Sequence, residues 1–281
     1  MKILFMSLLD CKTIYFHGLY SDLLRKFVEH GDEVVVIAPS ERRNKQKEQV
    51  IREKGATIIK VKILNMQKTN IIEKGMSMLT IEHVFINAIK KNLSDMKFDL
   101  ILYSTPPITF FGAVNYIRKR DGAKSYLLLK DIFPQNAVDI GMMKRSGIWK
   151  IIYKYFRNKE KKLYAISDYI GCMSQANVNY IIAHNPEVNS EIIEVCPNSM
   201  DPLDLSCSEE KRIVIRKMYG IPLNKKVFIY GGNLGKPQGI DFMLKCIHSQ
   251  QKNNNIFFLV IGNGTEYGKL KNYYETYKPE N

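Results

Sequence analysis

The chain of 281 residues has few cysteines, no long apolar run and fewer acidic than basic side chains. Its five cysteines lie far apart and form no Cys-x-x-Cys pair. This excludes a disulfide scaffold, argues against a zinc site and predicts reduced thiols. No stretch approaches the roughly 20 apolar residues of a membrane-spanning helix. We therefore expect a globular protein that is soluble or peripheral to a membrane.

The apolar start of the chain is too short for a secretory signal. The run from Ile3 to Leu9 is interrupted by Ser7 and ended by Asp10, and no small-residue cleavage site follows. We interpret it as a first buried strand.

Two common nucleotide-binding motifs are also missing. The sequence has no Gly-Lys-Ser/Thr of a Walker loop and no Gly-x-Gly-x-x-Gly of a dinucleotide site. The second absence argues against an NAD-type oxidoreductase or epimerase.

Short apolar runs alternate with longer segments of helical spacing, a pattern that predicts an α/β protein built from parallel βαβ units. The expected strands are 2–8, 33–38, 57–61, 100–103, 125–129, 169–173, 192–196, 226–230 and 256–261. The expected helices are 20–30, 46–54, 71–95, 108–121, 147–163, 176–184, 209–219, 240–250 and 266–277.

The alternation pauses once and then restarts, which predicts two domains. Residues 1–200 form one complete Rossmann-like domain, 201–208 a linker, and 209–281 the first half of a second Rossmann-like domain. Two strands bury too little apolar surface to be stable alone. The second domain is thus expected to lean on the first or to be truncated after Asn281.

The net charge of +14 is spread evenly over the length, but one segment is densely basic. Lys144–Lys162 holds eight basic residues and one acidic residue. Helical spacing places Lys150, Lys154, Arg157 and Lys161 on one stripe beside aromatic residues. Such a stripe suits an anionic membrane surface, and the alternative is an ordinary solvated helix. No nucleic-acid-binding motif accompanies it.

Glycine-rich segments follow both strands of the second domain. Gly231 to Gly239 follows one strand, and Gly262 to Gly264 follows the other. Glycines let backbone N–H groups approach a phosphate, and Lys236 would neutralise its charge. A glycine turn without a ligand is the alternative.

In the first domain, polar residues follow three strands. They are His17 with Gly18, Thr105, and Lys130 with Asp131. A carboxylate at a strand tip accepts a proton from a sugar hydroxyl. The alternatives are a helix cap or a partner of Lys130 for Asp131, and a hydrogen-bonded loop residue for His17.

In order along the whole chain, the motifs resemble those of retaining GT-B glycosyltransferases of family four, in the bacterial capsule and O-antigen branch. The segments that carry the resemblance are the loop ending in His17-Gly18 with LYSDLLRKFVEHGDEVVVIAP after it, KDIFPQNAVDIGMM (130–143), SQANVNYI (174–181), CPNSMD (196–201), YGGNLGKPQGIDFML (230–244) and VIGNGTEYGKLK (260–271).

The resemblance implies two domains facing each other across a cleft, the first binding the acceptor and the second the nucleotide-sugar donor. We assign catalysis to Asp131 and His17, and acceptor binding to Lys130 and Thr105. The residues assigned to the donor are Gly18, Gly232, Asn233, Lys236, Gln238, Gly239, Gly262 and Gly264. Many members carry Arg in place of Asn233 and Lys in place of Gln238, so Lys236 is expected to supply the positive charge here.

By the same resemblance, the enzyme moves a hexose onto a lipid-linked or polysaccharide acceptor in cell-surface polysaccharide synthesis. It needs no cofactor and no metal, in agreement with the lack of an Asp-x-Asp motif. We expect it in the cytoplasm, peripheral at the inner face of the plasma membrane. The family's glutamate pair near the donor would lie beyond Asn281. The alternative is thus a truncated chain that only binds acceptor, membrane or a partner subunit.

Overall fold

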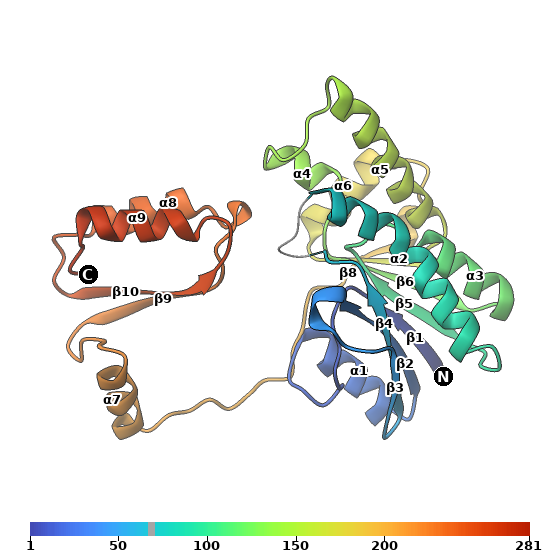
Figure 1. The fold of residues 1–281 in the computed structure, drawn as a ribbon, viewed down its shortest axis with the longest axis horizontal. Coiled ribbons are helices and arrows are strands. Elements are labelled where there is room, and N and C mark those ends of the chain that lie inside the picture. The colour runs from blue at the N-terminus through green and yellow to red at the C-terminus, as the bar shows by residue number, and fades with distance from the viewer. Residues whose placement is uncertain (67–70) are drawn as a thin grey trace. The chain divides into compact units, whose positions relative to one another are not determined.

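The computed structural model describes residues 1–66 and 71–281 (Figure 1). The chain divides into two compact units, Met1–Pro202 and Leu203–Asn281, and each has its own sheet. The first unit includes Asp201, the residue before its last, and Asp201 is hydrogen-bonded to Arg25 and Asp22 near its first helix. Among the described residues, no helix has both the length and the apolar character needed to cross a membrane.

Eight strands among the described residues of the first unit form one sheet, in the order β3-β4-β2-β1-β5-β6-β7-β8. Their bounds are β1 (Lys2–Met6), β2 (Glu33–Glu41), β3 (Gln49–Glu53), β4 (Ala56–Ile63), β5 (Leu100–Ser104), β6 (Lys124–Leu129), β7 (Tyr169–Cys172) and β8 (Ile193–Val195). All neighbouring pairs are parallel except β3 with β4. The strand order reverses between β1 and β5, which makes this pair the topological switch point.

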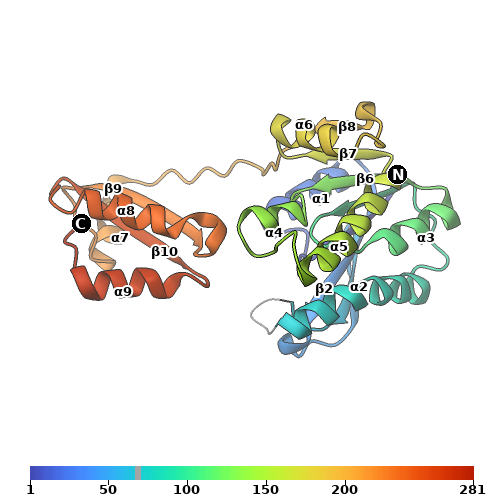
Figure 2. The same cartoon turned by 90° about the horizontal axis from the view of Figure 1, so that it is seen from above.

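Helices cover both faces of this sheet, because successive strand residues point to opposite sides. On one face Ile3 and Phe5 pack with Leu24 of α1 (Leu19–Glu29). On the other face Leu4 and Met6 share a core with residues of four helices, and Figure 2 labels these helices. The helices with buried residues in this second core are α2 (Ile71–Asn92), α3 (Phe111–Asp121), α5 (Ile148–Ala165) and α6 (Gln175–His184). The unit also has three short helical segments, η1 (Arg42–Asn44), α4 (Gln135–Asp139) and η2 (Ser190–Ile192).

One predicted helix is wrong. The segment 46–54 forms strand β3, which pairs antiparallel with β4 across a turn at Gly55. Gly55 has a φ of 74°, a backbone conformation that favours glycine. The β-branched residues of β3 face those of β4, with Ile51 opposite Ile58. This cross-strand packing, which helical spacing cannot reveal, decides the outcome. The fold class is still confirmed, with one antiparallel strand at the edge of an otherwise parallel sheet.

The second unit has two parallel strands, β9 (Lys226–Asn233) and β10 (Ile256–Asn263). Its helical segments are α7 (Glu209–Met218), η3 (Lys236–Gln238), α8 (Ile240–Ser249) and α9 (Tyr267–Tyr277). The sequence placed both glycine-rich segments in loops. Instead β9 and β10 continue into the first residues of these segments, and Gly232 pairs with Gly262 in the parallel ladder. The two extended glycine segments lie in register, so their backbones go on pairing until Asn233 and Asn263.

Candidate functional site

The predicted residues of the first unit gather at one edge of the sheet, where the parallel strands have their carboxyl ends. His17 and Gly18 follow β1, Thr105 follows β5, and Lys130 and Asp131 follow β6. Because β1 and β5 form the switch point, the fold brings all five residues to the position where open parallel sheets bind ligands.

A pocket of about 700 Å³ opens at this edge. Its apolar lining consists of Leu8, Leu9, Pro39, Ile63, Met66, Met78, Pro106 and Phe133. Its polar lining consists of Asp10, Glu41, Arg43, Asn44, Asp131 and Asn136. Pockets of this size with a mixed lining hold small molecules. This lining suits a ligand that has hydroxyl groups and an apolar part.

Asp131 lines this pocket as an exposed residue, and partial desolvation of its carboxyl raises its pKa above the ordinary value of 3.8. A carboxylate with a raised pKa is a stronger proton acceptor near neutral pH. Neighbouring Lys130 is half-buried, and burial lowers the pKa of its ammonium group. The helix-cap alternative for Asp131 is wrong, because Pro134 is the N-cap residue of α4.

Thr105 was predicted to contact an acceptor, but the structure gives its side chain an internal role. Thr105 is 2% exposed. Its hydroxyl oxygen accepts hydrogen bonds from the backbone N–H groups of Lys130, at 3.0 Å, and of Asp131, at 3.3 Å. Thr105 thus ties the end of β5 to the segment that carries the two charged residues.

Asp10 is a pocket residue that the sequence did not single out as functional. Its carboxylate forms an ion pair with Lys60, a side chain that is 2% exposed. Lys60 also donates to the carbonyl oxygen of Cys11 at 3.0 Å. A buried lysine requires such partners, and it holds Asp10 in place. The signal in the sequence was an aspartate at the end of the first buried strand.

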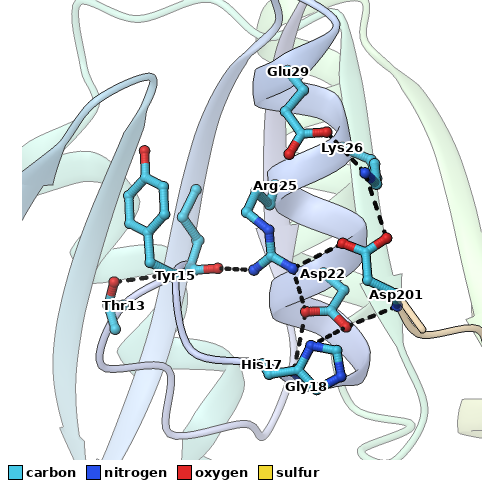
Figure 3. A network of polar contacts seen from close by, with 10 residues as sticks. Thr13, Tyr15, His17, Gly18, Asp22, Arg25, Lys26, Glu29 and Asp201 are labelled. Carbon is cyan, nitrogen blue, oxygen red and sulfur yellow. Dashed lines mark hydrogen bonds and ion pairs between the residues drawn. The ribbon is translucent and has the colours of Figure 1, made fainter. Parts of the chain in front are cut away.

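A second missed group surrounds the start of α1 and consists of Asp22, Arg25 and Asp201 (Figure 3). The guanidinium of Arg25 donates to Asp22 at 2.6 Å and to Asp201 at 3.0 Å. Asp22 also accepts from the backbone N–H of Gly18, at 3.1 Å. Nδ1 of His17 lies 3.1 Å from Oδ2 of Asp22. His17 is therefore a loop residue within ion-pair distance of a buried carboxylate.

The start of α1 and the segment after β6 are close enough to interact. Burial raises the pKa of the Tyr20 phenol, and the negative charge of Asp131 raises it further. Tyr20 packs on Phe5, with 5.1 Å between the ring centroids. His17, three residues before Tyr20, and Asp131 thus belong to the same edge of the sheet.

In the second unit, the predicted donor residues lie at the carboxyl ends of β9 and β10. Lys236 is exposed in η3, between β9 and α8. Two of these residues contact each other: Nδ2 of Asn233 donates to Oε1 of Gln238 at 3.3 Å. Gly239 has a φ of 64° where η3 ends and α8 begins, and Gly232 pairs in the ladder.

Gly262 and Gly264 are glycines because two backbone segments approach each other closely. A Cβ atom on Gly262 would lie 2.1 Å from the carbonyl oxygen of Gly232. One on Gly264 would lie 2.4 Å from the carbonyl oxygen of Leu234. This packing accounts for both glycines without a ligand.

The basic stripe of α5 is divided by its contacts. Arg157 donates to Glu160 at 2.7 Å and to the carbonyl oxygen of His184 at 2.9 Å. Lys161 lies 2.8 Å from Glu187. Arg157 and Lys161 thus contact the segment at and after the end of α6, although Lys161 itself is exposed, as are Lys150 and Lys154. Beside Lys150 and Lys154, Ile148 and Ile151 are 73% and 71% exposed.

Among residues 1–66 and 71–281, no group of three or more His, Cys, Asp or Glu side chains is arranged to hold a metal ion. The metal-independent reaction stays a prediction.

Three solved structures with similar folds belong to the GT-B class. The first, described as "Trehalose-6-phosphate from E. coli bound with UDP-2-fluoro glucose", has a TM-score of 0.69 at 10% identity, covering 100% of this chain and 71% of that chain. Anabaena Alr3699/HepE in complex with UDP has a TM-score of 0.61 at 13% identity, covering 100% and 67%. An α,α-trehalose-phosphate synthase (UDP-forming) from Burkholderia vietnamiensis has a TM-score of 0.56 at 12% identity, covering 99% and 68%. The chain therefore has an α/β fold of the GT-B glycosyltransferase type.

In sequence, the chain is similar to the probable glycosyltransferase WbjE of Pseudomonas aeruginosa. The two are 25% identical over 210 residues, which are 73% of this chain and 49% of WbjE. The chain thus spans about half the length of this curated relative. No profile of a known protein family matches the chain.

Proposed function

We propose that this chain is a glycosyltransferase, or part of one, that moves a sugar from a nucleotide-sugar donor to an acceptor bound in the first unit. The observation that carries the proposal is the pocket at the switch point, with the Asp131 carboxylate in its lining. Two further observations support it. The chain is similar in sequence to a probable glycosyltransferase. Of the solved structures with a similar fold, one is bound with UDP-2-fluoro glucose and another is in complex with UDP.

In this proposal Asp131 accepts the proton of the acceptor hydroxyl while the sugar is transferred. The raised pKa suits Asp131 to this role, because it strengthens a carboxylate as a base. Lys130 binds an anionic or hydroxyl group of the acceptor. Thr105 holds the segment of both residues in place.

The donor is assigned to the second unit, and the resemblance to family four also assigns Gly18 to donor binding. Lys236 supplies positive charge to the diphosphate, and the amides of Asn233 and Gln238 donate hydrogen bonds to it. Gly232 and Gly239 leave the backbone beside Lys236 open to a phosphate. Gly262 and Gly264 lie near the base or ribose. Such fixed donors would stabilise the leaving diphosphate without a metal ion.

The finer features of the reaction follow the resemblance to family four. We infer a hexose donor, retention of anomeric configuration and a lipid-linked or polysaccharide acceptor for cell-surface polysaccharide. Nuclear magnetic resonance of the product decides the configuration: a product anomer opposite to that of the donor contradicts retention.

We also propose that the protein lies at the inner face of the plasma membrane, bound through the start of α5. Two exposed isoleucines, Ile148 and Ile151, lie beside two exposed lysines, Lys150 and Lys154. An apolar stripe flanked by lysines suits insertion between anionic lipid head groups. This surface replaces the stripe expected from the sequence, because Arg157 and Lys161 already have partners within the unit.

A ligand screen with the whole chain tests the donor assignment. At a concentration 100 times its Kd, a donor stabilises the folded chain by about 2.7 kcal/mol, which thermal unfolding detects. We expect UDP-hexoses to raise the Tm, and Lys236→Ala to weaken this effect. Lys245→Ala, which removes another exposed lysine of the same unit, is the control. A Lys236→Ala chain that binds donor like the control contradicts the role of Lys236.

A further inference from the structure

His17 and Asp22 form a contact at the start of α1 that the roles assigned above do not use. Nδ1 of His17 lies 3.1 Å from Oδ2 of Asp22 (Figure 3). The Asp22 side chain is 3% exposed, while that of His17 is 28% exposed. One edge of the imidazole is therefore held against a buried carboxylate, and the ring itself stays accessible to a ligand.

The remaining partners of Asp22 are all hydrogen-bond donors. They are the backbone N–H groups of Gly18 and Asp201, each at 3.1 Å, and the Arg25 guanidinium, at 2.6 Å. Burial by itself would raise the pKa of the Asp22 carboxyl, but these bonds and the neighbouring His17 lower it to about 2. At neutral pH Asp22 is thus ionised and has no proton to donate. A lone pair on Nδ1 would face this negative charge at 3.1 Å, so the contact favours a proton on Nδ1.

The location of this proton decides what the other ring nitrogen does. A neutral imidazole carries one N–H, so a proton on Nδ1 leaves Nε2 with a free lone pair. Within the part of the chain that the structure describes, Nε2 has no hydrogen-bond partner of its own. Histidine in water favours the opposite tautomer, with the proton on Nε2.

Asp22 is itself held from two sides, which makes it suitable for fixing a ring. Arg25 lies between the carboxylates of Asp22 and Asp201 and also donates to the carbonyl oxygen of Ile14, at 3.0 Å. These contacts join the β1–α1 loop, α1 and the segment that follows β8. A carboxylate with partners in three segments has little freedom to turn away from His17.

We propose that Asp22 is a positioning residue, which holds His17 in the Nδ1–H tautomer and presents Nε2 as a hydrogen-bond acceptor to a hydroxyl group of a sugar ligand. A lone-pair nitrogen at the carboxyl edge of the sheet has the chemistry to take this bond. The role in transfer rests on the proposed function, whereas the tautomer does not.

Nuclear magnetic resonance of the ¹⁵N-labelled whole chain at pH 8 tests the tautomer without any substrate. In the wild type we expect His17 to show a protonated Nδ1 and an unprotonated Nε2. In Asp22→Asn, whose amide group can donate to Nδ1, we expect the proton to move to Nε2. A wild-type His17 with its proton on Nε2 overturns the proposal, and this measurement needs no variant to fold.

A second aspartate–histidine pair supplies the matched control. Nδ1 of His30 lies 3.1 Å from Asp32, on the same unit. Asp32→Asn should leave the His17 tautomer unchanged. If Asp22→Asn and Asp32→Asn shift the His17 signals alike, the effect is general and the proposal fails.

Activity separates the two proposals. If the wild type transfers sugar, His17→Gln should lower kcat/KM about tenfold or more, and adding Asp22→Asn should then change little, because the residues act as a unit. If Asp22→Asn lowers kcat/KM as much in the His17→Gln chain as it does in the wild type, the positioning role is overturned. If the wild type shows the Nδ1–H tautomer but binds no UDP-sugar, the result supports the effect of Asp22 on the His17 tautomer. The same result contradicts the proposed function.

Discussion

The hydroxyl oxygen of Thr105 lies 3.0 Å from the backbone nitrogen of Lys130, and this bond joins two strand ends at the pocket. The same oxygen accepts from the N–H of Asp131 at 3.3 Å. One buried side chain thus sets the path of the segment that carries both charged residues of the proposed acceptor site.

Thr105→Val tests this arrangement. Valine has a similar shape but no hydroxyl, so the N–H groups of Lys130 and Asp131 lose their acceptor. We expect the free energy of unfolding to fall by about 1–3 kcal/mol, measured by urea denaturation. Thr80→Val, at an exposed position of α2, should change it by less than about 0.5 kcal/mol. If the free energy of unfolding falls equally in the two variants, the hydrogen bonds of Thr105 do not contribute the expected stability.

Asp131→Asn removes the proposed proton acceptor while keeping its size. We expect kcat to fall about 100-fold or more, with a smaller change in the KM for the acceptor. In the wild type, partial desolvation raises the pKa of Asp131 above 3.8, so the rate should fall as the pH drops through that raised pKa and the carboxylate gains a proton. The control is Asp139→Asn, an aspartate of α4 that does not line the pocket. An Asp131→Asn enzyme with unchanged kcat would refute this role.

The low pKa of Asp22 predicts how stability changes with pH. Its pKa is about 2 in the folded chain, against an ordinary value of 3.8, so the ionised form is the one that folding favours. The stability that Asp22 contributes is therefore complete above about pH 4 and is lost as the pH falls towards 2. Asp22→Asn cannot ionise, so the wild type should be the more stable at pH 6, and the difference should shrink below pH 4. A difference in urea midpoint that stays constant down to pH 2 contradicts this account.

Gly262→Ala should destabilise the second unit. The added Cβ would lie 2.1 Å from the carbonyl oxygen of Gly232, so β10 must move away from β9. We expect a loss of about 1–3 kcal/mol and faster amide hydrogen exchange in both strands. Gly268→Ala in α9 meets no atom within 4 Å and should stabilise the helix by up to about 1 kcal/mol. The prediction is wrong if both alanine variants behave alike.

The surface at the start of α5 predicts binding to anionic vesicles. Ile148→Ser with Ile151→Ser should reduce co-sedimentation, and so should Lys150→Gln with Lys154→Gln, which also makes binding less sensitive to salt. Lys161→Gln is the control, because that lysine is paired with Glu187. Binding that none of these changes reduces would leave α5 an ordinary solvated helix.

Local pattern predicted most of the fold. Apolar runs such as Glu33–Ala38 gave strands, and helical spacing gave α1 and α5, because core-facing residues repeat with the period of each element. The pattern failed at 46–54, where a short segment of mixed character became β3. Its partner, β4, lies beyond a turn, and pairing across that turn decided its structure.

The proposed site divides in the same way. The strand-following residues His17, Lys130 and Asp131 were identified from the sequence alone, because in a parallel sheet all strand ends of one kind meet at one edge. The buried partners were not. Asp22 and Asp201 are 179 residues apart, and nothing in the sequence near either one indicates the other.

The sequence by itself determined an α/β chain with a parallel sheet, the loops that carry its polar residues and a basic helix. Only the tertiary structure decided which charges are paired, which hydroxyl is buried and which face of α5 is exposed. The reason is physical: hydrophobic periodicity is a local property of the chain. Burial and hydrogen bonding depend on segments that meet only when the sheet has formed.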